Sequence, residues 1–183
     1  PGATNLVTGI ATAYMDSTPM VAITGNVTRP LLGKDSFQEV DITGITMPIT
    51  KHNYIVKDIK DLQKIINEAF YIASSGRHGP VLIDIPKDIT AEKYNYITME
   101  PKNRKKSLQH ININSLERFA QLINESENPF IYAGGGILSS NAEKEVLALA
   151  EKINAPVATS LMGIGSIPND HRLYTGMIGM HGT

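Results

Sequence analysis

Two glycine-rich segments are the first places where this chain could bind a ligand. Gly134-Gly135-Gly136 follows a predicted strand and precedes a predicted helix, and Leu161-Met162-Gly163-Ile164-Gly165 again follows a strand. Backbone without side chains lets a phosphate approach amide N–H groups, and the carboxyl ends of parallel strands meet at one edge of a sheet. Together the two turns favour a nucleotide-like ligand. Their spacing is not that of a dinucleotide fingerprint, so two ordinary tight turns remain the alternative.

Three cations lie next to predicted strands, where a cleft would form. Arg77 occupies the turn Ser75–Pro80 between a helix and a strand, and its guanidinium could bind a phosphate or pair with a carboxylate. From the sequence alone, a surface ion pair is the favoured reading of Arg77. Lys51 precedes a strand and Lys87 follows one, so either could reach a cleft, although such lysines more often face solvent. The five His residues are far apart, which predicts neither a metal cluster nor a nucleophilic triad.

The composition limits the class of protein. With 183 residues, of which 42% are hydrophobic and 19% charged, the chain can bury a core in one domain or in parts of two. A net charge of −1 gives no general attraction for nucleic acid or an anionic membrane, and no apolar run approaches the roughly 20 residues that cross a bilayer. We therefore expect neither partner. The absence of Cys fits a reducing compartment, and we expect a cytoplasmic location.

The first half of the chain alternates between helical and strand periodicity. A helix with one apolar face runs from Asp58, which can cap it, to Gly76, and the strand that follows is apolar almost throughout, as in a parallel sheet covered on both faces. The other expected elements are a helix over residues 6–14, strands over 19–24, 52–56 and 81–85, a loop over 26–37 and a short helix within 40–49. The pattern predicts an α/β fold.

A second α/β unit follows a polar stretch. From Asp88 to about Asn112 there is no apolar stripe, so we interpret this stretch as a connector, including its basic cluster at residues 102–106. Asn114 and Glu117 then resemble a capping box for a helix with one apolar face, and Ser140 and Glu143 mark the start of another helix. Strands are expected over residues 130–133 and 156–159. The alternation predicts parallel sheets flanked by helices on both faces.

Long stretches of the chain resemble the catalytic subunits of acetohydroxyacid synthase (acetolactate synthase), a thiamine-diphosphate enzyme family. The resemblance spans nearly the whole chain, and its motifs occur in the same order. They are residues 1–10 (PGATNLVTGI), 13–17 (AYMDS), 21–25 (VAITG), 35–39 (DSFQE), 49–53 (ITKHN), 79–88 (GPVLIDIPKD), 161–163 (LMG) and 179–183 (GMHGT). Pyruvate oxidase, pyruvate decarboxylase and glyoxylate carboligase share the architecture but not this full series.

The resemblance implies a domain organisation. Residues 1–90 would be the C-terminal part of a pyrimidine-binding domain, 91–112 a linker, and 113–183 the N-terminal part of a central, Rossmann-like FAD-binding domain. We expect the chain to be an internal part of a longer subunit, because Pro1-Gly2-Ala3-Thr4-Asn5 resembles neither a native start nor a signal peptide. The family's activating Glu would precede residue 1 and its Mg²⁺-binding segment would follow residue 183. The resemblance thus implies no metal site within this chain and no turnover by the chain alone.

The resemblance also assigns roles to individual residues. Ser17 and Gln38 would lie at the thiamine-diphosphate pocket, with Phe37 beside the substrate and inhibitor channel and Lys51 and Lys87 lining it. Residues that match FAD-contacting positions are Arg77, Gly135, Ser160, Leu161, Ile178, Gly179, Met180 and His181. The sequence departs from the commonest family pattern at Asn26, Thr28, Ser36 and His78. Thr28 and Ser36 fall in the inhibitor-channel loop, which leaves herbicide sensitivity open.

The activity implied for the intact protein is the joining of two 2-oxo acids. Pyruvate would be decarboxylated with thiamine diphosphate as electron sink, and the product would add to a second pyruvate or to 2-oxobutanoate, the first common step of branched-chain amino acid biosynthesis. Mg²⁺ and a structural FAD would complete the cofactors. We expect a homodimer or homotetramer, with a possible small regulatory subunit. The alternatives are a related thiamine-diphosphate and FAD enzyme such as pyruvate oxidase, or a non-catalytic nucleotide-binding module.

Overall fold

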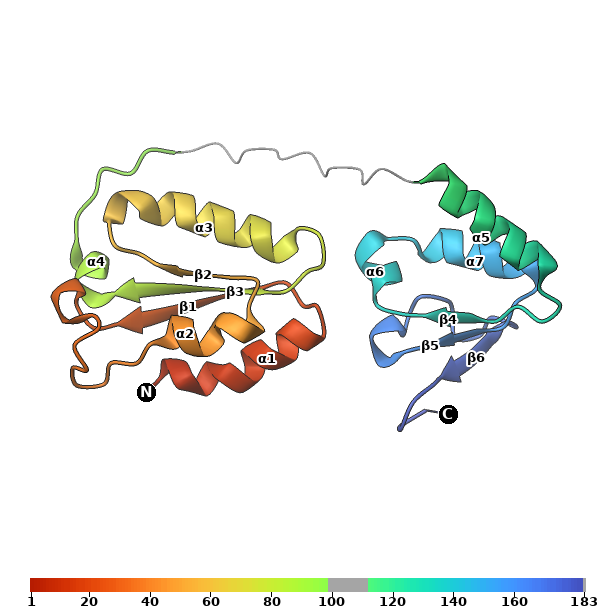
Figure 1. Cartoon of the computed structure of the whole chain (residues 1–183), viewed down its shortest axis with the longest axis horizontal. Helices are drawn as coiled ribbons and strands as arrows, with labels where there is room; N and C mark the ends of the chain where they lie inside the picture. The colour runs from red at the N-terminus through yellow and green to blue at the C-terminus, as the bar shows by residue number, and fades with distance from the viewer. Residues whose placement is uncertain (99–111, 183) are drawn as a thin grey trace. The chain divides into compact units, whose positions relative to one another are not determined.

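The structure is a computed structural model that describes residues 1–98 and 112–182. The chain divides into two compact units, Pro1–Ser107 and Leu108–Thr183, which we describe separately. In each unit the described strands form one parallel sheet flanked by helices (Figure 1), so the predicted fold class is confirmed.

The first unit has a sheet with the strand order β1-β3-β2. Its strands are β1 (Met20–Asn26), β2 (His52–Ile55) and β3 (Pro80–Pro86), and its α-helices are α1 (Val7–Met15), α2 (Ile42–Thr46), α3 (Ile59–Ser74) and α4 (Lys87–Ala91). Short 3-10 turns cover Ala3–Leu6, Arg29–Leu31 and Met47–Ile49. Figure 1 shows α3 on one face of this sheet and α1 and α2 on the other.

The central strand β3 is covered on both faces, as its apolar sequence predicts. Val81 and Ile83 belong to the core cluster beneath α3, whereas Leu82 packs with Ile10 of α1 and Ile42 of α2 on the opposite face. All three β3 side chains have no exposed surface. Asp58 caps α3 as predicted, because its carboxylate accepts a hydrogen bond from the amide of Lys60 at 2.9 Å. The helix thus begins where its cap is and covers the sheet with one apolar stripe.

The second unit has a sheet with the strand order β4-β5-β6. Its strands are β4 (Ile131–Ala133), β5 (Val157–Thr159) and β6 (Tyr174–Met177), its α-helices are α5 (Ile113–Glu125), α6 (Gly136–Ser140) and α7 (Glu143–Ile153), and a 3-10 turn covers Leu161–Gly163. Its core cluster consists of Ala133, Ala150, Val157, Ile167 and Leu173. Figure 1 shows the helix α7 running along the sheet, and its residue Ala150 is fully buried there.

The predicted polar connector begins later than Asp88. Residues Lys87–Ala91 form α4, whose Ile89 is fully buried in the cluster beneath α3. A single apolar residue was too little periodicity to predict this turn of helix, yet it anchors the chain to the core. Residues 92–98 belong to no helix or strand, and the basic cluster at 102–106 lies outside the described residues.

Of the residues predicted to mark helix starts in the second unit, Asn114 and Ser140 are wrong, whereas Glu143 is correct. The side chain of Asn112, not Asn114, caps α5 by accepting from the amide of Ser115 at 3.4 Å. Ser140 ends α6 instead of starting a helix, and α7 begins at Glu143 after Ala142, which has no side-chain cap. The apolar face of α5 is present, but Leu116, Phe119 and Leu122 are each about half exposed. Their spacing therefore predicted the helix correctly, but the spacing does not show whether the apolar face is covered.

Candidate functional site

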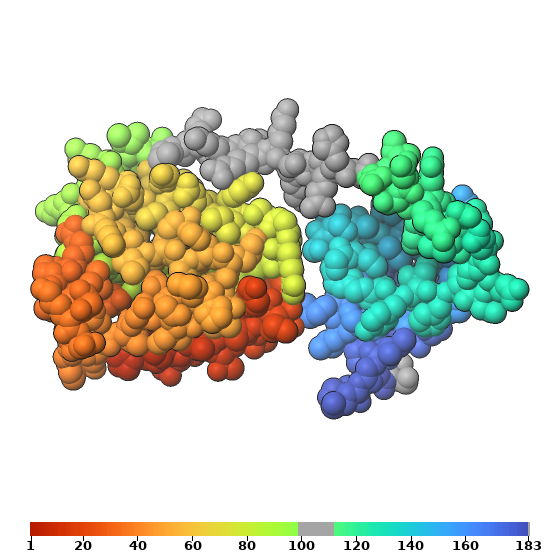
Figure 2. All heavy atoms as spheres, viewed as in Figure 1, coloured from red at the N-terminus to blue at the C-terminus, as the bar shows by residue number. Residues whose placement is uncertain are grey.

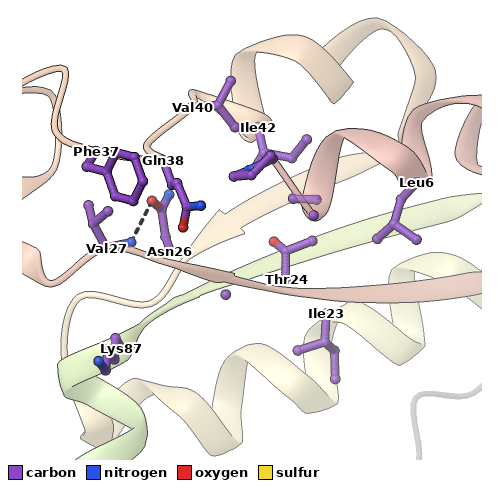
Figure 3. A pocket seen from close by; sticks show the side chains of 14 residues that line it. Leu6, Ile23, Thr24, Asn26, Val27, Phe37, Gln38, Val40, Ile42 and Lys87 are labelled. Carbon is purple, nitrogen blue, oxygen red and sulfur yellow. Dashed lines mark hydrogen bonds between the residues drawn. The ribbon is translucent and has the colours of Figure 1, made fainter.

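The first unit holds an open cavity of about 620 Å³ at the carboxyl ends of its strands. Ligands of open α/β sheets bind at this edge, because loops after parallel strands diverge there. The cavity is lined by Pro1, Gly2, Ala3, Leu6, Ile23, Thr24, Gly25, Asn26, Val27, Phe37, Gln38, Val40, Ile42 and Lys87. Figure 3 shows Phe37, Gln38 and Asn26 close together at the end of β1, with Lys87 across the strand at the start of α4. Its wall combines aliphatic side chains with the polar side chains of Thr24, Asn26, Gln38 and Lys87, which could orient a small molecule.

A buried carboxylate supports the floor of this cavity. Asp84 lies in the middle of the sheet and has no exposed surface. One of its oxygens accepts from the hydroxyl of Thr24 at 2.7 Å and the other from the side-chain amide of Asn26 at 2.5 Å. The amide oxygen of Asn26 in turn accepts from the backbone N–H of Val27 at 2.8 Å, the dashed line in Figure 3. The end of β1 is thereby fixed by hydrogen bonds that begin on β3.

A second carboxylate shapes the loop that carries Phe37 and Gln38. Glu39 accepts from the backbone amide and the hydroxyl of Ser36, both at 2.9 Å, and from the backbone amide of Gly33. These hydrogen bonds, that from Ser36 first, lower the pKa of the Glu39 carboxyl. Figure 2 shows the loop in dark orange at the surface of the first unit. The loop is therefore held by its own carboxylate, although it lies at the surface.

The two residues that this loop presents are unusually placed. The side chain of Phe37 is 87% exposed at the edge of the cavity, and the backbone of Gln38 has φ = 63°. A left-handed backbone is costly for a residue with a Cβ atom. Strain of this kind gathers at binding and catalytic sites, where it aims a side chain. Gln38 thus combines a left-handed backbone with a place in the lining of the cavity.

Arg29 fastens the start of the same loop to α4. Its guanidinium binds Asp88 at 2.6 Å, Glu92, and the carbonyl of Lys57 at 3.0 Å. The hydrogen bond from Arg29 is the main cause that lowers the pKa of Asp88. Since Asp88 follows Lys87 directly, this ion pair joins the loop after β1 to the helix that carries the cation of the cavity. Thr28 and Ser36 belong to this loop but are not among the residues that line the cavity.

Three predicted site residues lie at the opposite, amino edge of the sheet. The guanidinium of Arg77 donates to the hydroxyl of Ser17 at 2.7 Å and to the carbonyl of Met15 at 3.4 Å. The amine of Lys51 donates to the carbonyl of Ser75 at 2.6 Å and to that of Ile72, at the end of α3. Burial lowers the pKa of Lys51. Within one chain, Ser17 and Lys51 thus lie outside the cavity that Gln38 and Lys87 line.

In the second unit, the two glycine turns pack against each other at the carboxyl edge. The amide of Ser160 donates to the carbonyl of Ala133 at 2.9 Å, and a Cβ atom on Gly135 would lie 3.0 Å from the Cβ atom of Met162. The amide of Ile178 donates to the carbonyl of Thr159 at 2.9 Å, which brings the turn 178–182 to the same edge. The residues predicted to contact FAD, except Arg77 of the first unit, thus gather after β4, β5 and β6.

Several residues of the site escaped the sequence analysis. Asp84 carries the clearest missed signal, because a carboxylate inside an otherwise apolar strand must find hydrogen-bond donors when it is buried. Asn26 was noted only as a departure from the family pattern, and Arg29 and Glu39 were not singled out. The side chains of Asn26 and Arg29 bind carboxylates that lie 58 to 63 residues away, which no local pattern shows.

Residues 1–98 and 112–182 contain neither a candidate metal site nor a helix that could span a membrane. No three His, Asp or Glu side chains among them gather as a metal site would require. No helix in these ranges has both the length and the apolar character to span a bilayer.

Two family models match the chain. The model "Thiamine pyrophosphate enzyme, N-terminal TPP binding domain" matches residues 1–45, and "Thiamine pyrophosphate enzyme, central domain" matches residues 116–183. The first match includes the loop and β1 side of the cavity, and the second includes all three strands of the second sheet. Along the chain, the match to the N-terminal domain model precedes the match to the central domain model.

Curated relatives align over the whole chain. It is 50% identical to the acetolactate synthase large subunit of Cyanidium caldarium, 51% to that of Parasynechococcus marenigrum and 48% to that of Buchnera aphidicola subsp. Acyrthosiphon pisum. Each alignment covers 100% of this chain and between 30% and 33% of the relative, so the chain spans about a third of the length of these proteins. The chain belongs to the thiamine pyrophosphate enzymes and is a homologue of the acetolactate synthase large subunits.

Proposed function

We propose that the protein containing this chain is the large subunit of an acetolactate synthase, which condenses two pyruvate molecules, or pyruvate and 2-oxobutanoate, with release of CO₂. The observation that carries this proposal is the identity of about 50% to such subunits along the whole chain. The reaction would be the first common step of branched-chain amino acid biosynthesis, in the cytoplasm. In this proposal residues 1–90 belong to the pyrimidine-binding domain, 91–112 to a linker and 113–183 to the central domain.

The cavity of the first unit fits part of a thiamine diphosphate site. Its volume of about 620 Å³ and the aliphatic side chains in its lining suit an aromatic heterocycle, and the amide of Gln38 can donate and accept hydrogen bonds at the ring edge. Phe37 would cover the ring from the loop. When bound, thiamine diphosphate supplies the electron sink for decarboxylation of a 2-oxo acid. Mg²⁺ would be held with the diphosphate by residues outside this chain.

Lys87 is the cation that we assign to the substrate. It lines the cavity at the start of α4, and its ammonium can attract the carboxylate of an incoming 2-oxo acid. The Arg29–Asp88 ion pair positions α4, because Asp88 is the next residue and its carboxylate also accepts from the backbone amide of Arg29 at 3.0 Å. Phe37 and the aliphatic side chains that line the cavity would keep water from the reacting carbon. The chain's own residues thus bind, orient and exclude water.

We assign FAD to the carboxyl edge of the second sheet. The observation that supports this is the convergence of Gly135, Ser160, Leu161 and the turn 178–182 after three parallel strands, at the edge where ligands of open α/β sheets bind. Arg77 remains a proposed contact to the flavin diphosphate. A homodimer or homotetramer, with a possible small regulatory subunit, would supply the groups that this chain lacks. Ser17 and Lys51, at the amino edge, would serve a cofactor or channel only through another chain.

The experiment is an assay of the full-length protein with pyruvate, thiamine diphosphate and Mg²⁺, with and without FAD, while oxygen uptake is recorded. Acetolactate without stoichiometric oxygen consumption is the expected result. Acetyl phosphate with peroxide would identify a pyruvate oxidase instead. Cofactor binding without any turnover would identify a non-catalytic module.

A further inference from the structure

The polar network behind the cavity is independent of the groups assigned to cofactor and substrate. Asp84 is fully buried, and its two oxygens accept from Thr24 at 2.7 Å and from Asn26 at 2.5 Å. Both donors line the cavity, whereas Asp84 itself does not. A buried carboxylate is costly, so a chain keeps it where its hydrogen bonds are needed.

The hydrogen bonds run in one direction through this network. Asn26 uses its amide N–H₂ on Asp84 and its amide oxygen on the backbone N–H of Val27, at 2.8 Å. If the amide of Asn26 flipped, its N–H₂ would face the N–H of Val27 and its oxygen would face the carboxylate of Asp84. Neither hydrogen bond could then form, so Asn26 is held in one orientation. Val27 also lines the cavity and starts the loop that leads to Gln38. The orientation of Asp84 thus fixes the amide of Asn26, and this amide fixes the point where the loop leaves the sheet.

We propose that Asp84 is a positioning residue for the reaction: acting through Asn26 and Thr24, it sets the floor of the cavity and the exit of the loop that carries Phe37 and Gln38. This inference rests on the proposed function for its kinetic consequences. Its structural part, the fixed polarity of the Asp84–Asn26–Val27 chain, does not depend on that function.

The polarity can be tested by exchanging the two side chains. In Asn26→Asp, two carboxylates face each other within hydrogen-bond distance, so one must take up a proton or move away. In the double variant Asn26→Asp/Asp84→Asn, the new amide at 84 donates to the carboxylate at 26, which still accepts from the amide of Val27. The amide oxygen at 84 accepts from Thr24. Every hydrogen bond is restored, and the composition and net charge are those of the original chain.

The expected effect of Asp84→Asn on kcat/KM therefore depends on residue 26. It lowers kcat/KM in the original protein and raises it when Asn26→Asp is also present. Alone, it lowers kcat/KM for pyruvate in the full-length protein by about tenfold, because it leaves one buried donor without an acceptor. Asn26→Asp lowers kcat/KM by about a hundredfold, because displacement of the cavity lining misplaces the substrate. The double variant recovers to within about threefold of the original protein. Hydrogen exchange at the Val27 amide accelerates in the Asn26→Asp variant and slows again in the double variant.

A matched control is Asp58→Asn, which changes the cap of α3 in the same way but does not line the cavity. It should lower thermal stability slightly and leave kcat/KM unchanged. A double variant that is no more active than Asn26→Asp, or that does not fold, overturns the proposal, as does an Asp84→Asn variant with the original kcat/KM. If the unmodified protein makes no acetolactate, the proposed function fails, while the exchange rates of Val27 still test the network.

Discussion

Gly163 lies so close to the end of β4 that a Cβ atom built on it would be 2.2 Å from the carbonyl oxygen of Ala133. The same atom would be 2.9 Å from the carbonyl carbon of that residue. Both neighbours are backbone atoms of the core and have no rotamer to change. The packing of the two glycine turns therefore depends on the absence of a side chain at this position.

Gly163→Ala should destabilise the second unit by about 1–3 kcal/mol, because the turn after β5 must move away from β4. Gly136→Ala is the matched control: a Cβ atom there would meet nothing within 4 Å, and the position lies in α6, where alanine favours the helix. Native-state hydrogen exchange of the β4 and β5 amides measures both effects. Equal protection in the two variants would contradict the role of the close approach.

Substitutions of Lys51 and Lys87 should affect different properties of the protein, stability in one case and the KM for pyruvate in the other. Lys51→Met removes the donor to the carbonyls of Ile72 and Ser75 but keeps the aliphatic stem, so it should cost about 1 kcal/mol of stability and leave the KM for pyruvate unchanged. Lys87→Met should raise that KM without a loss of stability, because Lys87 lines the cavity. Calorimetry and steady-state kinetics on the full-length protein measure the two effects. A higher KM in Lys51→Met would contradict this prediction and would support a role for Lys51 in the substrate channel.

These two lysines show where the sequence was informative and where it was not. The predicted order of strands and helices in the chain is largely that of the structure, because hydrophobic periodicity and the Asp58 cap are local signals. The prediction for the two lysines did not use the sheet edge that each of them reaches. That edge depends on whether the lysine precedes a strand, as Lys51 does, or follows one, as Lys87 does, and this topological rule would have separated them.

The burial of a helix face was also beyond the sequence. The apolar residues of α3 and of α5 recur with the same spacing, but those of α3 cover a sheet and those of α5 stay about half exposed. Periodicity tells which side of a helix is apolar, not whether a surface is present for it to cover. In the same way, α4 escaped prediction because its contact with the core is one residue, Ile89.

The loop that carries Phe37 and Gln38 should loosen in acid. Hydrogen bonds from Ser36 and Gly33 lower the pKa of Glu39 below its ordinary value of 4.5, so the folded loop favours the ionised carboxylate. Its stabilisation is therefore complete above pH 4.5 and is lost as the pH falls through the lowered pKa. The amide shifts of Gly33 and Ser36, followed by NMR, should titrate together below 4.5. In Glu39→Gln this titration should be absent, and its persistence would assign it to another carboxyl.

Gln38 should show a trade between stability and activity. Its φ of 63° is a left-handed conformation that glycine adopts freely, so Gln38→Gly should stabilise the folded protein by about 0.5–1 kcal/mol. The same change removes the amide that we assign to the thiamine ring and should lower kcat/KM at least tenfold. Gln38→Asn is the informative comparison, because asparagine tolerates this backbone but its amide is one methylene shorter. It should keep the stability of the original protein and recover only part of the activity. If Gln38→Gly were fully active, the strain at this position would have no function in the site; if it were less stable, the left-handed backbone would not be the conformation that costs energy.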